Sequence, residues 1–158
     1  FETPSPSTLH QAVVLRLTRV FDRALEDAGD GLVFIAPLDV RLAPDTIVQP
    51  DIMILLGERL IGVVDDAVER PPSIVIAVLS QSTSRRDLTI KRNLYAAYEV
   101  YEYWIADPAG KTVTIHTDPA EGQYCAVVTS RDTTSSVLLP TVSFDVSKLF
   151  TPISRLKL

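Results

Sequence analysis

An apolar run that follows two prolines constrains the fold of this chain more than any other feature. Residues 73–80 read Ser-Ile-Val-Ile-Ala-Val-Leu-Ser, without a charged side chain. Such a run is typical of a strand that is covered on both faces, as central strands of α/β sheets are. Pro71 and Pro72 fix two φ angles and withhold two amide donors, so the strand can begin only after them. We therefore predict an α/β sheet with this strand near its centre.

A helix and a second strand are predicted directly after this run. Residues 80–83 offer helix caps, and apolar residues then recur with a period of 3.6 to about residue 99. We expect the buried stripe of this helix to comprise Ile90, Leu94, Ala97 and Tyr101. Residues 103–106 form the next strand, and a strand, helix, strand unit of this kind is parallel and right-handed.

The rest of the chain supplies one long helix and several antiparallel strands. Residues 9–28 have helical periodicity, with Ser7 or Thr8 as N-cap and Gly29 or Gly31 as the stop. Period-two runs predict a hairpin over residues 32–56 and a meander over 112–129, with an exposed connection at 57–70 and a short helix at 146–150. The expected fold class is thus α/β (α+β), a central mixed sheet flanked by helices with a C-terminal antiparallel meander.

Size and composition indicate a single soluble domain. With 158 residues, 46% of them hydrophobic, residues 1–158 can bury one core but are too few for two ordinary domains. The one cysteine, Cys125, cannot form an internal disulfide and lies in an apolar run, so we expect a buried thiol and a reducing, cytoplasmic location. No apolar segment approaches the roughly 20 residues of a membrane span.

The charge distribution gives two signals about nucleic acid. A net charge of −5 argues mildly against a broad phosphate-binding face, because such faces depend on Lys and Arg. A local cluster of four positive residues nevertheless occurs at Arg85, Arg86, Lys91 and Arg92. It can be read as a solvated helix face, with Asp87 and Lys91 paired at i,i+4 spacing, or as a local basic patch.

A series of short motifs resembles a known family when it is taken in order. The series covers nearly the whole chain: Ser5-Pro6-Ser7 with His10-Gln11, Pro37-Leu38-Asp39-Val40, Gln49-Pro50-Asp51, Val78-Leu79-Ser80, Ser82-Thr83, Asp87, Lys91, Tyr95, Glu102-Tyr103-Trp104-Ile105 and Asp107-Pro108. It is similar to a large bacterial family of restriction-endonuclease type in the PD-(D/E)XK nuclease superfamily. The resemblance implies a restriction-endonuclease-like fold, Mg²⁺-dependent hydrolysis of DNA phosphodiester bonds, and the option of a homodimer.

The resemblance also implies a set of site residues. Asp51 matches the family aspartate that holds Mg²⁺ or Mn²⁺, hard cations that prefer carboxylate oxygen. Ala77 stands where family members usually carry a glutamate ligand, and Leu79 stands at the superfamily lysine. Lys91 matches a helical lysine that substitutes for it and would stabilise negative charge on the phosphate. Asp87 either orients Lys91 or pairs with it.

Ala77 leaves two functional hypotheses open. The first is a metal-dependent endonuclease, weakened by the loss of one carboxylate unless a remote acid such as Asp39 or Asp87 replaces it. The second is a binding or scaffold protein that keeps the nuclease fold without the reaction. Natural loss and deliberate substitution of the acid are both compatible with the sequence. Family members also carry an acid before the Pro/Ser stretch, so we expect this chain to lack a native N-terminal segment.

We expect structural roles for five aromatic or histidine residues. His10 matches a family histidine and is expected to be a hydrogen-bonding residue at the helix entry. His116 is expected on an exposed strand face. Tyr101, Tyr103 and Trp104 fall between a helix and a central strand, which favours packing over base stacking. The two histidines have no metal-ligand spacing.

Overall fold

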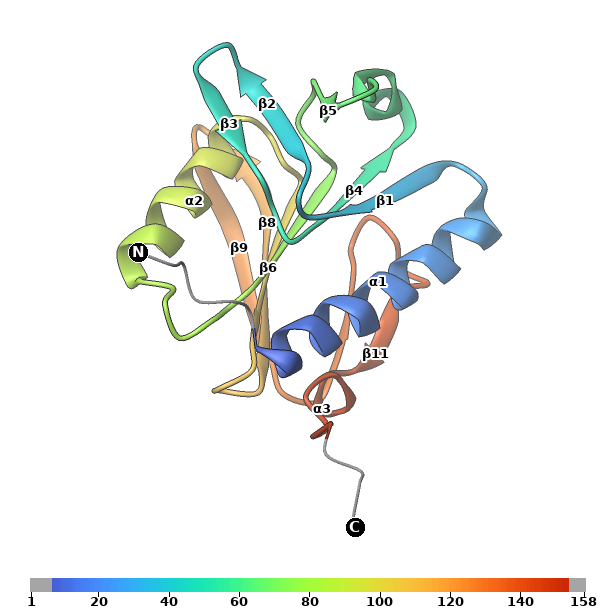
Figure 1. Ribbon diagram of the computed structural model, residues 1–158, viewed down its shortest axis with the longest axis vertical. Coiled ribbons are helices and arrows are strands. Elements are labelled where there is room, and N and C mark those ends of the chain that lie inside the picture. Colours follow the sequence, from blue (N-terminus) through green and yellow to red (C-terminus); the bar gives the residue numbers. More distant parts are fainter. Residues whose placement is uncertain (1–6, 154–158) are drawn as a thin grey trace.

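The computed structural model describes residues 7–153, and its centre is a six-stranded mixed sheet in the order β1-β4-β6-β7-β8-β9. Helix α1 covers one face of this sheet and helix α2 the other (Figure 1). Within this six-stranded sheet, β6 and β7 are the only parallel neighbours, and they are the strands of the predicted strand, helix, strand unit. The predicted fold class is confirmed. The strands are β1 (Gly31–Ile35), β4 (Ile52–Leu56), β6 (Ile74–Val78), β7 (Glu102–Asp107), β8 (Thr112–Ala120) and β9 (Gln123–Ser130).

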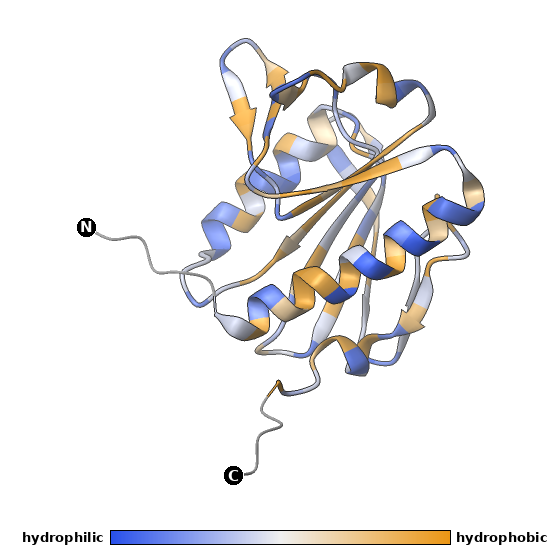
Figure 2. Ribbon diagram, turned by 45° about the vertical axis from the view of Figure 1, so that its right-hand side comes forward, coloured by the Kyte–Doolittle hydropathy of each residue, from blue (hydrophilic) through white to orange (hydrophobic). Residues whose placement is uncertain are grey.

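Helix α1 (Thr8–Ala28) begins and ends where the sequence indicated. The Ser7 side chain accepts a hydrogen bond from the His10 amide, and Gly29 adopts a left-handed conformation with φ of 71°, which glycine tolerates without steric cost. One stripe of the helix is apolar and faces the sheet, while the opposite side is hydrophilic (Figure 2). Burial of this stripe, rather than helix propensity alone, fixes α1 in place.

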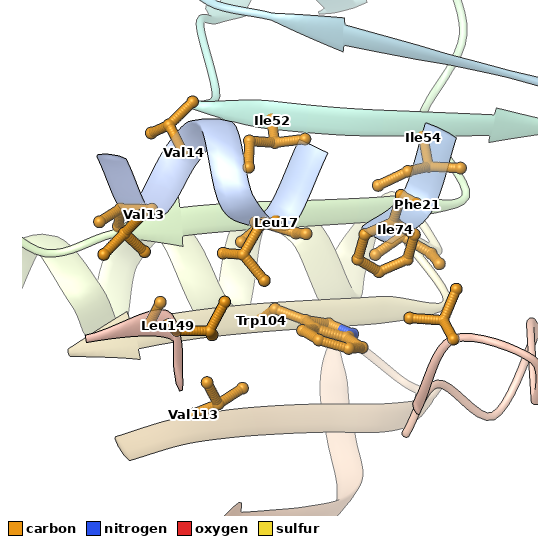
Figure 3. Close-up of a cluster of buried hydrophobic side chains, with 14 of the residues drawn as sticks. Val13, Val14, Leu17, Phe21, Ile52, Ile54, Ile74, Trp104, Val113 and Leu149 are labelled. Carbon is orange, nitrogen blue, oxygen red and sulfur yellow. The ribbon is translucent and has the colours of Figure 1, made fainter. Parts of the chain in front are cut away.

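Alternating residues of β4 point into two cores, one on each face of the sheet. Ile52 and Ile54 join the core beneath α1, whereas Met53 and Leu55 join the core beneath α2. Phe21 of α1 meets Trp104 of β7 edge to face, with ring centroids 5.2 Å apart (Figure 3). The sheet therefore packs against a core on each of its two faces, and this packing fixes the positions of both ends of its central strands.

Helix α2 (Arg85–Ala97) presents a different face to the sheet from the one predicted. Tyr95 is buried and packs against Tyr103, with ring centroids 5.0 Å apart, whereas Ile90 is 50% exposed. Of the predicted stripe, Leu94 does pack against the core, but Ile90, Ala97 and Tyr101 are exposed, because the adjoining side of the helix with Tyr95 and Ala96 is the buried one. Lys91, one turn before Tyr95, is consequently half-buried on the side that faces the sheet.

The predicted hairpin over residues 32–56 divides between two sheets. Its outer parts pair as β1 and β4, and its inner parts, β2 (Asp39–Ala43) and β3 (Thr46–Val48), pair in a smaller sheet completed by β5 (Ala67–Val68). A 3-10 helix, η1 (Gly57–Gly62), lies in the connection predicted at 57–70. The antiparallel pairings are confirmed, but the parallel pairing of β2 with β5 was not predicted.

The C-terminal segment returns to α1. It contains β10 (Thr133–Ser135), β11 (Ser143–Asp145) and the expected short helix, α3 (Val146–Leu149). The Arg16 guanidinium of α1 donates to the carbonyl oxygens of Leu149 and Thr151, at 2.8 and 2.9 Å. No helix in residues 7–153 is long and apolar enough to cross a membrane.

Two side-chain environments differ from the expectations. His116 is buried rather than exposed, because its ring stacks on Tyr103 and its Nδ1 lies 3.2 Å from the Tyr103 carbonyl oxygen. Cys125 is exposed rather than buried, because β9 is the edge strand of the sheet and little packs over it.

Candidate functional site

Asp51 and Ala77 occupy neighbouring positions on two central strands. The antiparallel register pairs Ile52 with Ile76, so the next residues outward, Asp51 and Ala77, face each other across β4 and β6. Side chains at facing positions project to the same side of a sheet. The position of the expected second carboxylate is therefore beside Asp51, and an alanine methyl group occupies it.

The Asp51 carboxylate is held in place by a hydrogen bond, without a Lys or Arg partner among residues 7–153. Its Oδ2 atom accepts a hydrogen bond from the Val78 amide at 2.8 Å, and its side chain remains 30% exposed. Among residues 7–153, no Lys or Arg nitrogen lies within 4.0 Å of it. A positioned and partly exposed carboxylate that lacks a basic partner has capacity to hold a cation.

His10 is the polar side chain that approaches Asp51 from α1. Its Nε2 atom lies 3.7 Å from Asp51 Oδ2, and the ring is buried. The Nδ1 atom is also buried and has no hydrogen-bond partner among the described residues. The first turn of α1 positions the ring, since the Ser7 cap fixes the His10 backbone.

A cleft with a volume of about 780 Å³ opens at this end of the sheet. It is formed where the start of α1, the start of β4, the segment after β6 and the turn after β7 converge. Its lining includes hydroxyl and amide groups as well as the two ionisable side chains. The lining residues are Ser7, Leu9, His10, Asp51, Leu79, Ser80, Gln81, Ser82, Pro108 and Ala109.

Two tyrosines lie near Asp51 on the α2 side of the sheet. Burial raises the pKa of Tyr103 to about 12, and the negative charge of Asp51 adds to the rise. Burial also raises the pKa of Tyr95, with further contributions from Tyr103 and Asp51. Both phenols are therefore neutral near pH 7 and can act as hydrogen-bond donors.

The other two predicted site residues lie on α2, outside the lining of the cleft. Lys91 shares the sheet-facing side of the helix with Tyr95, whereas Asp87 is exposed in the first turn. No ion pair joins Asp87 to Lys91 within 4.0 Å in the described part of the chain. The negative charge of Asp87 instead lies at the positive end of the helix dipole.

Neither of the two acids expected as possible replacements, Asp39 and Asp87, lines the cleft at Asp51. Asp39 Oδ1 accepts a hydrogen bond from Gln49 Nε2 at 2.7 Å in the smaller sheet. Residues 7–153 contain no group of three His, Cys, Asp or Glu side chains that could hold a metal ion. The described donor set near Asp51 is thus one carboxylate with one imidazole close by.

His10 was expected to be a structural hydrogen-bonding residue rather than a base, and Tyr95, although part of the motif series, was not predicted to lie near Asp51. The proximity of His10 to Asp51 depends on how α1 crosses the sheet, and no local pattern records that. For Tyr95 a signal existed, because Asp87, Lys91 and Tyr95 follow one another at intervals of four and so share one helix side.

Comparisons with known proteins agree with this architecture. A solved structure from Anabaena variabilis ATCC 29413, described as a putative nuclease, superposes with a TM-score of 0.77 over 96% of this chain and 85% of that chain, at 16% sequence identity. This likeness shows the fold. No curated protein sequence matches the chain.

The sequence itself carries the stronger evidence. Residues 1–148 match the model of the Uma2 family, which is described as "Putative restriction endonuclease". That match supports a nuclease-like function, and proteins with this type of fold generally use divalent metals. Because the match covers nearly all of the chain, the protein belongs to the Uma2 family.

Proposed function

We propose that the cleft at Asp51 is a phosphodiester hydrolase site for DNA whose rate is limited by the alanine at position 77. The observation that carries this proposal is the register of β4 and β6, which sets Ala77 beside a positioned carboxylate without a Lys or Arg partner among residues 7–153. Membership of the Uma2 family supports nuclease chemistry. An alanine in place of a second carboxylate ligand is the reason that we expect a reduced rate.

The described residues near Asp51 offer one carboxylate to the Mg²⁺ or Mn²⁺ ion that the family implies. Mg²⁺ is commonly held by one or two carboxylates, with water and substrate phosphate completing its shell. Asp51 meets the lower limit of that requirement. A bound ion would lower the pKa of a coordinated water and neutralise charge on the phosphate. With Asp51 as the only carboxylate in the described lining of the cleft, tight binding of such an ion would require the DNA phosphate as a further ligand.

Lys91 and Asp87 have distinct proposed roles. Lys91 is half-buried on the sheet-facing side of α2, where its ammonium would stabilise negative charge on the phosphate. Asp87 would orient Lys91 when DNA is bound, since the two side chains lie one helical turn apart. Both are positioned by α2, whose N-terminus is capped by the Ser84 hydroxyl.

The exposed side of α2 offers a contact surface for the DNA backbone. Arg85, Arg86 and Arg92 are exposed, and none of them is in an ion pair within residues 7–153. Free arginines of this kind neutralise phosphates on binding and release counterions. The segment Ser80–Ser82, which lines the cleft, leads directly into this helix.

A second candidate function is a non-catalytic binding or scaffold protein. The observation that favours it is the packing of Ala77 against the core beneath α2, where Ile105 faces it on β7. Apolar packing at a ligand position is what a site that no longer binds metal would retain.

The test compares the present chain with Ala77→Glu, Asp51→Ala and the control Asp39→Ala, which removes a carboxylate away from the cleft. Plasmid nicking and binding of Mg²⁺ or Mn²⁺ by calorimetry are followed in parallel. We expect Ala77→Glu to gain both metal affinity and nicking, Asp51→Ala to lose any activity, and Asp39→Ala to resemble the parent. If no variant binds metal or cuts DNA, the scaffold function replaces the nuclease function.

We further propose that two copies pair through β9. This edge strand has no charged residue and no proline, and Val127 and Val128 are 54% and 61% exposed. Antiparallel pairing of β9 with a second copy would bring the Glu121 end of one strand to the Arg131 end of the other. Sedimentation should show a dimer that Val128→Lys dissociates, while the control Val137→Lys, at an exposed residue outside β9, should not.

A further inference from the structure

His10 carries an unexplained feature that the proposed reaction does not use. A histidine kept only for helix entry would be expected to have its buried nitrogens hydrogen-bonded. Here Nδ1 is buried without a partner among the described residues, and Nε2 is directed at Asp51 from 3.7 Å, beyond hydrogen-bond distance. The ring is therefore in an environment that suits neither a structural hydrogen-bonder nor an ordinary apolar contact.

The separation of the two atoms suits a shared metal ion. Ligands about 2.1 Å from a tetrahedral metal centre lie about 3.4 Å from each other. The observed 3.7 Å between His10 Nε2 and Asp51 Oδ2 is within a few tenths of an ångström of that value. Asp51 Oδ2 accepts one hydrogen bond, from the Val78 amide, and its second lone pair can coordinate a metal ion that His10 Nε2 shares.

The chemistry of this pair differs from that of two carboxylates. Mg²⁺ prefers oxygen donors and gains little from imidazole, whereas Co²⁺, Ni²⁺ and Zn²⁺ bind mixed nitrogen and oxygen sites well. Replacing a second carboxylate by a neutral imidazole also removes one negative charge from the site. Both effects weaken Mg²⁺ relative to the late first-row metals.

We propose that His10 is the second metal ligand of this protein, in place of the acid absent at position 77, and that the His10 and Asp51 pair selects a late first-row divalent metal over Mg²⁺. The inference rests on the proposed function, because it takes Asp51 as a metal ligand. It concerns binding without DNA, so loss of nicking alone leaves it intact.

The experiment measures Co²⁺ and Mg²⁺ binding by calorimetry in the absence of DNA. All proteins carry Cys125→Ser, because an exposed thiol binds Co²⁺ on its own. We expect Co²⁺ to bind at least tenfold more tightly than Mg²⁺. His10→Leu should lose at least tenfold in Co²⁺ affinity, with Mg²⁺ affinity unchanged within twofold. His10→Glu should bind Mg²⁺ more tightly and reduce the preference for Co²⁺ at least tenfold.

A second readout does not depend on any variant at His10. The chain has two histidines, and His116 is buried against Tyr103 on the α2 side. Co²⁺ bound to the imidazole should move the ring proton signals of His10 far outside their ordinary range in the NMR spectrum, by contact through the metal–nitrogen bond. Those of His116, which would not be a ligand, should show only smaller through-space shifts. Equal affinity for Mg²⁺ and Co²⁺, retention of Co²⁺ binding by His10→Leu, or absence of contact-shifted His10 signals would each overturn the proposal.

Discussion

Replacing Ala77 by glutamate tests the geometry of the site through stability, independently of any DNA substrate. Residues that face each other across antiparallel strands have Cβ atoms about 5 Å apart. Two carboxylates at about 5.5 Å repel by about 3 kcal/mol at an effective dielectric constant near 20. Ala77 is only half-buried, so solvent and glutamate flexibility reduce this cost. We expect Ala77→Glu to be about 1–3 kcal/mol less stable than the uncharged control Ala77→Gln.

A divalent metal should remove this difference. An ion that binds only the folded state at a hundred times its dissociation constant stabilises it by about 2.7 kcal/mol. Urea unfolding followed by circular dichroism, at low salt and with or without Mn²⁺, measures both effects. Mn²⁺ should restore Ala77→Glu and leave Ala77→Gln nearly unchanged. If the two variants have equal stability, and Mn²⁺ acts alike on both, side chains at positions 51 and 77 do not share a site.

Three further predictions concern other parts of the fold. Ser136→Ala removes the hydroxyl that donates to buried Glu102 at 2.6 Å and accepts from the Leu139 amide. Urea unfolding should show that the free energy of unfolding falls by about 2–4 kcal/mol. The control Ser135→Ala, at the exposed neighbour, should change it hardly at all. Burial lowers the pKa of His116 below its ordinary 6.5, and the charge of Arg92 adds to this. As the pH drops below about 6.5, the unfolded chain therefore takes up the proton first, and the free energy of unfolding should fall. An NMR titration in which His116 titrates at or above 6.5 would contradict this. Gly31→Ala places a methyl group 2.6 Å from Leu25 Cδ2 and 2.8 Å from Leu56 Cδ2. Thermal unfolding should show that the free energy of unfolding falls by about 1–3 kcal/mol. Combining Gly31→Ala with Leu25→Ala should relieve part of the steric strain.

The predictable parts of the fold were those with local signals. Helix α1 carries its own cap at Ser7, its stop at Gly29 and an unambiguous apolar stripe, and all three were confirmed. The central strand β6 was fixed by its apolar run and the preceding prolines. These features act within a few residues of the chain, so sequence alone contains the information.

The unpredicted parts depend on contacts between distant segments. The pairing of β2 with β5 has no turn that announces it. Helix α2 offers two apolar sides, and only the position of Tyr103 decides which one is buried. The exposure of Cys125 follows from the place of β9 at the edge of the sheet, a property of the strand order.

The candidate site divides in the same way. Asp51 and the absence of an acid at Ala77 could be identified from motifs, and their facing positions follow from strand register. The approach of His10 could not be predicted, since it depends on the crossing of α1 over the sheet. A site assembled by tertiary packing is visible in sequence only where each part has its own motif.

The two hydrogen bonds of Arg16 join helix α1 to helix α3 and the residues just after it. Arg16 and His10 belong to the same helix. That helix is held by the carbonyl oxygens of Leu149 in α3 and of Thr151 just after it, and by the apolar side chains of α3. Removing residues from 146 onward, or fusing a partner there, would therefore loosen the helix that places the His10 ring beside Asp51. A change at α3 would act on the candidate site although α3 lies outside the lining of its cleft.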